Sequence, residues 1–499
     1  MNLSKRLLVL GIDSFDHELM LKFQADLPNV RRLMTEGYDI KLRGVFPPDS
    51  PTSWASIYTG LNPAKHGVLL FVDPLEKAGR LVSEEIDNSI IRYRTFWDIA
   101  GNQGRIVRVF YPLLGYPVWE VNGTMVGRAT SSPDVQIYPP TRRKKELMNV
   151  KGLWGLPGMN QRGFIDDGRR MLASEVAFSR EFIGTEWDLF FFYSSILDPI
   201  QHGFWNCFDP SDPTYKSGNQ YEEVIKEFYV EYDKVLADFL RLVGNDTAVL
   251  LLSDHGHMRR PVNIVNVNRI LSQSGYLSTT FAAKRSLAKS VKMKVYERKA
   301  LVFGLLEKYR MDNVALAILR FMPTVKNVFT SPEVINWDET VAHVSDLSGV
   351  KAYTYGGIVI RREKLTDRSY EDVRTDIITQ LRSLRDSTNN KILMKWIERR
   401  EELYSGEFIA KYPDIVFEFE DDYGAGWSPS ESLVARSDLH SVSPGSHRID
   451  TPVMLLYDPT NQLQLERNQG DLVDVAPTIL RILDVTSGSD NIDGRSLVK

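Results

Sequence analysis

Cysteine is nearly absent from this chain of 499 residues, which contains only Cys207. A single cysteine excludes an intrachain disulfide and a cysteine-ligated metal cluster, and it favours a reducing compartment. No run of about 18 apolar residues occurs, so we expect no transmembrane helix. The formal net charge is only −4, and such a balance gives no bulk attraction to nucleic acid, for which we expect no binding.

The N-terminal apolar run, Leu7–Ile12, ends in Asp13, and no small-residue cleavage site follows it. It therefore predicts a buried first strand rather than a signal peptide, and we expect a cytoplasmic protein. Two similar runs, Trp187–Tyr193 and Ala248–Leu252, flank an amphipathic helical pattern over Tyr221–Val243. Buried strands that alternate with helices predict an α/β fold. The length predicts either two or three structural units or one large α/β domain with insertions.

An aspartate follows each of these three strands: Asp13, Asp198 and Asp254. In open α/β sheets, ligands bind beyond the carboxyl ends of the strands, so these carboxylates are candidate metal ligands. Asp198 and His202 are four residues apart, and they share one face if a helix begins there. For Asp13, the alternative is that this carboxylate caps a helix over residues 16–33.

The stretch Val45–Gly67 combines a loop with a helix start. Ser50 is predicted as the N-cap, Pro51 as the first helical residue, and Gly60 as the end of the helix. A serine hydroxyl at a helix N-terminus lies where backbone N–H groups and the helix dipole favour negative charge, which suits a nucleophile and the phosphate that it attacks. The alternative is that Ser50 only caps the helix.

Oxygen and nitrogen donors from these motifs form one candidate constellation, which a histidine in the predicted loop 443–448 completes. Its members are Asp13, Ser50, Asp198, His202, Asp254, His255 and His447. Such a mixture of imidazole and carboxylate suits two divalent metal ions, with zinc as the first choice and manganese or iron as the next. One cation would lower the pKa of the serine, and the other would stabilise the leaving oxygen of a phosphoryl group.

Taken together, these motifs resemble the alkaline phosphatase superfamily, in its type I phosphodiesterase/nucleotide pyrophosphatase branch, and look closest to its soluble prokaryotic members. The resemblance covers nearly the whole chain. It implies an alkaline-phosphatase-like three-layer sandwich with a central, mostly parallel sheet and an inserted helical or α+β cap. The motifs that carry it are Gly11–Asp13, Ser50–Gly67, Thr95–Asp98, Tyr116–Pro117, Val121–Gly123, Asp198–His202, Ser253–Gly256, Pro413–Gly424, Gly445–Arg448, Asp474–Leu480 and Asp493–Arg495.

The resemblance also implies a division of the ligands. Asp13, Asp254 and His255 would hold one cation together with the oxygen of the nucleophile, and Asp198, His202 and His447 would hold the other. The family nucleophile is usually threonine, and the matching position here is Ser50, with Thr52 as the fallback. Three other histidines match no ligand position: His257 and His440 are expected on the surface or behind the ligands, and His66 is expected to be structural.

Two departures from related patterns bear on the substrate. Animal nucleotide pyrophosphatases carry an asparagine that contacts the transferred phosphoryl group, and the matching residue here is Phe71, which argues against a specificity for nucleotide diesters. Sulfatases need proline and arginine two and four residues after their nucleophile. Thr52 and Trp54 stand there instead, so sulfate ester hydrolysis is not expected.

The predicted function is therefore hydrolysis of a phosphoester, small or polymeric, through a phosphorylated Ser50. A phosphodiester is the first choice of substrate and a phosphomonoester the close alternative. One alternative is an enzyme that transfers a phosphoryl group within one substrate. The other is a metal-binding relative that catalyses no reaction and acts as a binding protein. The expected domains are a catalytic core over 1–258 and 441–499 with an insertion over 259–440.

Within the insertion, residues 277–330 are rich in lysine and arginine, with leucine, valine and phenylalanine at helical spacings. This pattern predicts a solvated helical insertion over the mouth of the active site. The alternative is contact between residues 284–310 and an anionic lipid or polymer surface, which we do not favour. Residues 412–420 alternate with period two, as in a half-exposed strand.

Overall fold

The structure is a computed structural model of the whole chain. It describes residues 6–69, 88–129, 134–140, 156–157, 160–280, 305, 335–345, 352–485 and 491–499. Phe71 lies outside the described residues, as do nearly all residues of the basic segment 277–330 and of the alternative surface contact at 284–310. Of the helices that the structure describes, none has the length and apolar character of a membrane span.

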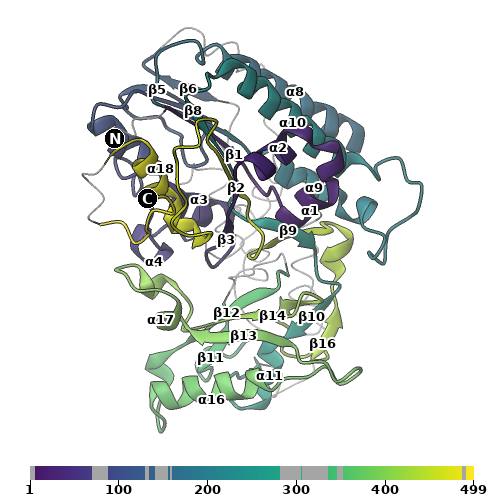
Figure 1. Cartoon of the computed structure of the whole chain (residues 1–499). Helices are drawn as coiled ribbons and strands as arrows, with labels where there is room; N and C mark the ends of the chain where they lie inside the picture. Colours follow the sequence, from purple (N-terminus) through teal and green to yellow (C-terminus); the bar gives the residue numbers. More distant parts are fainter. Residues whose placement is uncertain are drawn as a thin grey trace. The chain divides into compact units, whose positions relative to one another are not determined.

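The described residues fall into two compact units. The first unit contains those up to residue 69, those between 83 and 258, and those from 447 onwards. The second unit contains those between 259 and 446. Figure 1 shows the elements of both units along the chain.

An eight-stranded sheet lies at the centre of the first unit, with the strand order β2-β18-β8-β1-β7-β4-β5-β6. Neighbours from β8 to β5 run parallel, whereas β18 and β6 are antiparallel to the strands beside them. This confirms the predicted α/β fold with a mostly parallel sheet. The strands are β1 (Arg6–Ile12), β2 (Tyr38–Asp39), β4 (Val107–Phe110), β5 (Gly123–Arg128), β6 (Val135–Tyr138), β7 (Leu189–Ser194), β8 (Thr247–Leu252) and β18 (Met454–Tyr457).

β1 lies between β7 and β8, and its residues from 7 to 12 are buried. A strand that is covered on both faces needs apolar side chains at every position, which explains the continuous apolar run at 7–12. The carboxyl ends of β1 and β8 are adjacent in register, because Gly11 pairs with Leu252. The residues that follow these two strands, Asp13 and Asp254, therefore meet at one edge of the sheet.

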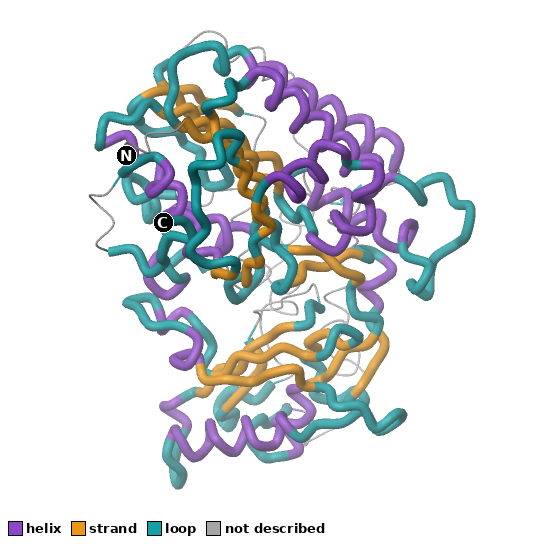
Figure 2. Tube along the Cα trace, in the orientation of Figure 1, coloured by secondary structure: helices purple, strands orange, loops and turns teal. Residues whose placement is uncertain are grey.

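Helices cover both faces of this sheet, and Figures 1 and 2 show the three layers. One apolar core joins one face of the sheet to α1 (His17–Phe23), α2 (Pro28–Glu36), α8 (Gln161–Arg180), α9 (Leu197–Phe208) and α10 (Val224–Leu242). A second core joins the other face to α3 (Ser50–Thr59), α6 (Phe96–Asn102) and α18 (Val475–Ile482). α4 (Pro63–His66) follows α3, β3 (Lys41–Arg43) pairs with β19 (Gln469–Asp471), and β9 (Gly256–Arg259) pairs with β17 (Gly445–Arg448).

The helix predicted over residues 16–33 is interrupted. Asp16, rather than Asp13, caps α1 by accepting a hydrogen bond from Leu19 N–H at 2.8 Å. α1 ends at Phe23, and a 3₁₀ turn over Gln24–Asp26 follows it. Leu27 has non-helical backbone because a residue before proline disfavours helical backbone, and Pro28 begins α2. The alternative in which Asp13 is only a helix cap is therefore wrong.

The second unit has its own apolar core. A four-stranded antiparallel sheet has the order β11 (Ala342–Val344), β12 (Tyr355–Ile360), β14 (Ile415–Phe419) and β13 (Met394–Arg399). A three-stranded sheet contains β15 (Tyr423–Gly426), β10 (Asn263–Asn266) and β16 (Val434–Arg436). Its helices include α11 (Val267–Gln273), α16 (Tyr370–Arg382) and α17 (Arg400–Leu403).

The prediction of a half-exposed strand over 412–420 is wrong, because every residue of β14 is buried. β14 is an inner strand with neighbours on both sides. Its polar residue Glu418 is buried and accepts a hydrogen bond from Trp396 Nε1 at 2.6 Å. Alternation in this strand therefore reflects a buried polar contact rather than exposure to solvent.

Candidate active site

Asp13 lies directly after β1, and its two carboxylate oxygens face different partners. Oδ2 accepts hydrogen bonds from Tyr193 O–H at 2.6 Å and from Trp54 Nε1 at 3.1 Å. Oδ1 lies 3.3 Å from Ser50 Oγ and 3.6 Å from His255 Nε2. The buried donors thus fix the orientation of the carboxylate, so that Oδ1 faces the other candidate residues.

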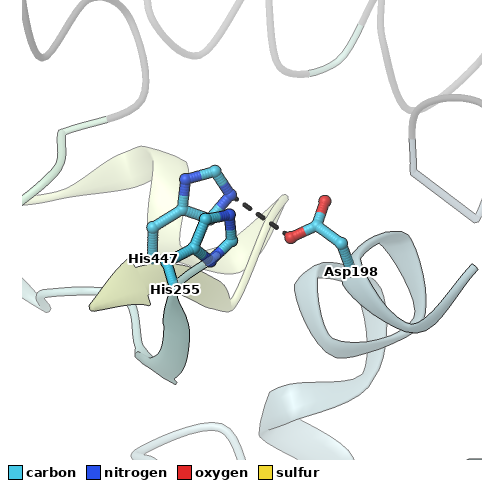
Figure 3. A group of neighbouring side chains, drawn as sticks. All are labelled: Asp198, His255 and His447. Atoms are coloured by element: carbon cyan, nitrogen blue, oxygen red, sulfur yellow. Dashed lines mark ion pairs between the residues drawn. The ribbon is translucent and has the colours of Figure 1, made fainter. Parts of the chain in front are cut away.

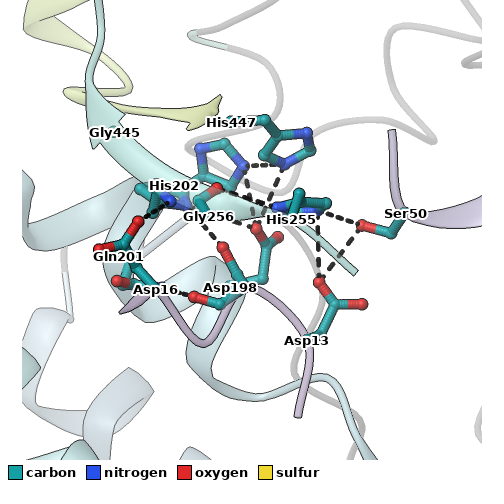
Figure 4. A network of polar contacts seen from close by, with 12 residues as sticks. Asp13, Asp16, Ser50, Asp198, Gln201, His202, His255, Gly256, Gly445 and His447 are labelled. Carbon is teal, nitrogen blue, oxygen red and sulfur yellow. Dashed lines mark hydrogen bonds and ion pairs between the residues drawn. The ribbon is translucent and has the colours of Figure 1, made fainter. Parts of the chain in front are cut away.

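Ser50 is the first residue of α3, and Asp49 occupies the N-cap position without a side-chain capping hydrogen bond. The predicted N-cap role of Ser50 is therefore wrong, whereas Gly60 closes the helix as predicted, with φ +67°. The Ser50 hydroxyl instead donates to Asp13 Oδ1 and lies 3.1 Å from His255 Nε2 (Figure 4). A hydroxyl at the N-terminus of a helix, next to a carboxylate and an imidazole, is well placed to react with a phosphate group.

Asp254 and His255 follow β8. Asp254 Oδ1 accepts the backbone N–H of Ser14 at 3.1 Å, and its Oδ2 lies 3.2 Å from His255 Nε2. His255 Nδ1 lies 3.1 Å from the carbonyl oxygen of Gly256. Because a carbonyl oxygen only accepts hydrogen bonds, Nδ1 carries a proton, and Nε2 is the ring atom that faces the two aspartates and could bind a cation.

Ser14 has the left-handed backbone conformation, with φ +64°, which is uncommon outside glycine. This conformation turns its N–H towards Asp254 while its Oγ lies 2.8 Å from His257 Nδ1. Its carbonyl oxygen accepts a hydrogen bond from Gln201 Nε2 on α9 at 2.7 Å. Ser14 therefore links the ends of β1 and β8 to the helix that carries Asp198.

The buried carboxylates repel one another. Burial raises the pKa of Asp254 to about 6, against an ordinary value of 3.8. Burial, together with the charges of Asp254 and Asp198, raises the pKa of Asp13 well above its usual range. Burial alone would lower the pKa of His255, but the nearby carboxylates outweigh this effect and raise it. Such a group of negative charges at low solvent exposure favours a bound cation.

A second group of donors adjoins the first. Asp198 and His202 lie one turn apart in the first half of α9, as their spacing predicts. Asp198 Oδ1 lies 3.2 Å from His447 Nε2 (Figure 3). It lies 3.4 Å from His202 Nε2, and the Nε2 atoms of His202 and His447 are 2.9 Å apart (Figure 4). His447 Nδ1 lies 2.8 Å from the carbonyl oxygen of Pro48 and must donate to it, which leaves Nε2 as an acceptor.

His447 lies in a strand rather than at the tip of a loop. Gly445–Arg448 forms β17, which pairs with β9. The Pro-Gly-Ser composition before His447 favours a loop, but pairing with β9 supplies backbone hydrogen bonds that composition cannot reveal. The rings of His447 and His255 stack with centroids 4.0 Å apart, so the two groups of donors lie side by side.

The donor chemistry fits divalent cations. Three sets of side chains each bring one ligand atom per residue within 4.8 Å of one another, and they are Asp13–Asp254–His255, Asp198–His255–His447 and Asp198–His202–His257. Neutral imidazole nitrogens and carboxylate oxygens in groups of three or four are typical zinc, manganese or iron ligands. The structure therefore brings all seven predicted site residues together in the first unit.

The sequence model of a known family matches most of the chain: type I phosphodiesterase/nucleotide pyrophosphatase, over residues 7–425. The chain belongs to this family. It is accordingly a hydrolase of phosphoric ester bonds, as the resemblance in its sequence predicts. A search of curated proteins found no significant match.

Solved structures share the fold of this family member. Murine ectonucleotide pyrophosphatase/phosphodiesterase 5, an inactive variant with AMP bound, matches with 12% identity and a TM-score of 0.52, covering 99% of this chain and 100% of its own. Phosphonoacetate hydrolase from Sinorhizobium meliloti, with phosphonoformate bound, matches with 15% identity and a TM-score of 0.56, covering 97% and 96%. Both likenesses confirm the alkaline-phosphatase-like fold.

The three remaining histidines of interest are buried. His66, in α4, lies 2.9 Å from Ser56 Oγ and accepts the N–H of Val68, in agreement with a structural role. His440, in the second unit, lies 2.9 Å from the carbonyl oxygen of Arg260. His257 and His440 were expected either on the surface or behind the ligands. The surface position is wrong for both, because their side chains are at most 3% exposed.

His257 is the residue that sequence reasoning missed. It joins one of the sets of potential ligands with Asp198 and His202. A signal for it exists in the sequence, because His255 and His257 are two residues apart next to a strand, and such residues point to the same face. The motif of the resembled family has no ligand at this position, so the resemblance gave no reason to include it.

Proposed function

We propose that this family member hydrolyses a phosphodiester through a covalent phosphoserine at Ser50, with two divalent cations beside it. The observation that carries the proposal is the position of Ser50 Oγ, 3.3 Å from Asp13 Oδ1 and 3.1 Å from His255 Nε2, at the N-terminus of α3. Thr52, the fallback nucleophile, is less well placed. Its Oγ1 is buried and forms no hydrogen bond with Asp13, His255 or any other described residue.

The ligands divide into two sets. Asp13, Asp254 and His255 would hold one cation with Ser50 Oγ, and Asp198, His202 and His447 would hold the other. When bound, the cations would lower the pKa of the Ser50 hydroxyl and offset negative charge on the phosphoryl and leaving oxygens. Zinc is the first choice because both sets contain imidazole.

The reaction runs in two displacements. Ser50 Oγ attacks phosphorus in line, so that the Oγ–P bond forms while the bond from phosphorus to the leaving oxygen breaks, and the leaving group departs as an alcohol. Water then attacks phosphorus from the vacated side, the Oγ–P bond breaks, and the Ser50 hydroxyl is restored. The N-terminus of α3 favours the charged phosphoryl group throughout.

The experiment that tests the nucleophile replaces it and leaves its neighbour as a control. Ser50→Ala should lower turnover at least about a thousand-fold, because it removes the atom that forms the covalent bond. The metal content should fall little, since the other ligands of that cation remain. Thr52→Val, on the same helix, should change turnover less than about threefold. An active Ser50→Ala with an inactive Thr52→Val would reverse the assignment.

The substrate class is tested with two chromogenic esters, bis-p-nitrophenyl phosphate and p-nitrophenyl phosphate, on samples whose metal content is measured. We expect preference for the diester and about two zinc ions per chain. Preference for the monoester would move the function to a phosphatase and leave the site assignment intact. Zinc well below two per chain in active enzyme would contradict the two-cation site.

A further inference from the structure

Three imidazoles, rather than two, surround the carboxylate of Asp198. The nitrogens nearest to Asp198 Oδ1 are His447 Nε2 at 3.2 Å, His202 Nε2 at 3.4 Å and His257 Nδ1 at 3.8 Å. One ligand atom each of Asp198, His202 and His257 lies within 4.8 Å of the others. His257 is therefore as much a member of this donor group as the two histidines already assigned to it.

The ring spacings agree with one shared cation. The centroid of the His202 ring lies 4.6 Å from that of His257 and 4.8 Å from that of His447, and the centroids of His257 and His447 are 6.0 Å apart. Imidazoles that bind one tetrahedral zinc ion through nitrogens at about 2 Å have their centroids about 5 Å apart. The His202 ring is thus spaced from each of the other two as ligands of a common ion would be, and the His257 and His447 rings are wider apart than that.

His257 is also held firmly. Its side chain is buried, its backbone N–H donates to Asp16 Oδ2 at 3.1 Å, and its ring lies beside Trp205 with centroids 5.4 Å apart. Its Nδ1 lies 2.8 Å from Ser14 Oγ, on the residue that also contacts Asp254. A ring that is fixed from several sides loses little conformational freedom when it binds a metal, and this favours His257 as a metal ligand.

We infer that His257 Nδ1 is a fourth protein ligand of the cation held by Asp198, His202 and His447. This inference rests on the two-cation site proposed above. Binding exchanges the hydrogen bond with Ser14 for a coordination bond, so that three imidazoles and one carboxylate surround the ion. Such a shell would favour zinc over magnesium or calcium, which prefer oxygen ligands.

Cadmium-113 NMR of the fully loaded wild-type protein tests the inference directly. We expect two cadmium resonances, one coupled to ring protons of three histidines and the other to those of one. Coupling of no cadmium to more than two histidines would overturn the role of His257 and leave the two-cation site standing. A single resonance at saturating cadmium would contradict the two-cation site itself, so the two failures are distinguishable.

Substitution supplies an independent arm. In His257→Cys, a thiolate in place of the imidazole should move one cadmium resonance strongly downfield and leave the other in place, because thiolate is a soft, strongly deshielding ligand. His440→Cys, a matched change of a buried histidine in the second unit, should move neither. Unchanged resonances in both variants would overturn the inference.

Affinity measured without turnover completes the test. His257→Phe keeps an aromatic ring beside Trp205 but removes the nitrogen. We expect zinc to bind at least about tenfold more weakly at one of the two sites, with the other unchanged, in competition with a chromogenic chelator. Equal affinities in His257→Phe and wild type would overturn the inference, and this variant decides the matter if His257→Cys does not fold.

Discussion

Among the places where the first unit buries ionisable side chains, two differ in how the charge is balanced. At the ends of β1 and β8, the carboxylates Asp13 and Asp254 face imidazoles, and no arginine or lysine of the described residues forms an ion pair with them. Farther along the same sheet, Arg128 at the end of β5 pairs with Glu175 on α8 at 2.9 Å, and both are nearly fully buried. One region has an excess of negative charge, and the other is neutral as a pair.

The comparison shows that burial alone does not mark a functional site. Burial raises the pKa of Glu175 to about 7, even though Arg128 opposes the shift, and it raises the pKa of Asp254 to about 6. Of these two regions, only the one that contains Asp254 needs a positive charge that the protein does not itself supply. The excess of carboxylate over cation, rather than the size of a pKa shift, distinguishes the candidate active site.

Removing one carboxylate from each region should have the largest difference in effect. Asp254→Asn takes a proposed ligand away, so we expect turnover to fall at least about a thousand-fold and bound zinc to fall by about one ion per chain. Glu175→Gln removes an equally buried carboxylate from the ion pair and should leave the zinc content unchanged. Elemental analysis and initial rates on both variants check this. Equal zinc in wild type and Asp254→Asn would refute the ligand assignment.

Removing the cations should expose the repulsion at the site as a dependence of stability on pH. In chelated protein, the raised pKa of Asp254 means that the folded state holds a proton which the unfolded state has lost between about pH 4 and 6. Its contribution to stability is complete below that range and is lost as the pH rises through it, by up to about 3 kcal/mol. His255, whose pKa is also raised, acts in the same direction.

The loaded protein should not show this loss, because bound cations keep the carboxylates ionised in the folded state. Glu175 also destabilises the fold as the pH rises towards 7, but it does so in both forms and cancels from their difference. Urea unfolding of loaded and chelated protein from about pH 4.5 to 8 measures that difference. A gap between the two forms that does not widen with pH would argue against the buried negative charge at the site.

Much of the fold could be predicted from the sequence, because the physical signal was local. The continuous apolar run at 7–12 required a strand that is covered on both faces, and β1 is such a strand. The spacing of Asp198 and His202 required only that a helix begin there. Helix ends were less certain: α3 begins one residue before the predicted first helical residue, because the backbone of Asp49 takes the cap position that Ser50 was expected to hold.

The parts that sequence could not supply depend on partners distant along the chain. The composition around His447 indicates a loop, and only the pairing of β17 with β9 makes it a strand. The alternation in β14 indicates half-exposure, and only the contact between Trp396 and Glu418 accounts for a buried polar residue there. His257 was missed because a single sequence gives no means to place Ser14 and Asp198 around it.

The smallest effect should come from replacing the neutral region entirely. None of the described residues hydrogen-bonds to Arg128 Nη1 or Nη2, so these buried donors lack the contacts that offset desolvation. The double variant Arg128→Met with Glu175→Leu removes both charges while keeping volume, and we expect its free energy of unfolding to lie within about 1 kcal/mol of wild type. Zinc content and turnover should not change.

Each single substitution should destabilise the protein more than the double one does, because it leaves one charge without its partner. For Arg128→Met the loss should grow above about pH 7, since Glu175 without its arginine resists ionisation in the folded state but ionises freely in the unfolded chain. Urea unfolding of the three variants at about pH 6 and pH 8.5 measures this. A double variant as unstable as the worse single variant would show that the Arg128–Glu175 pair contributes net stability. In that case, only metal binding would distinguish the active site from this buried pair.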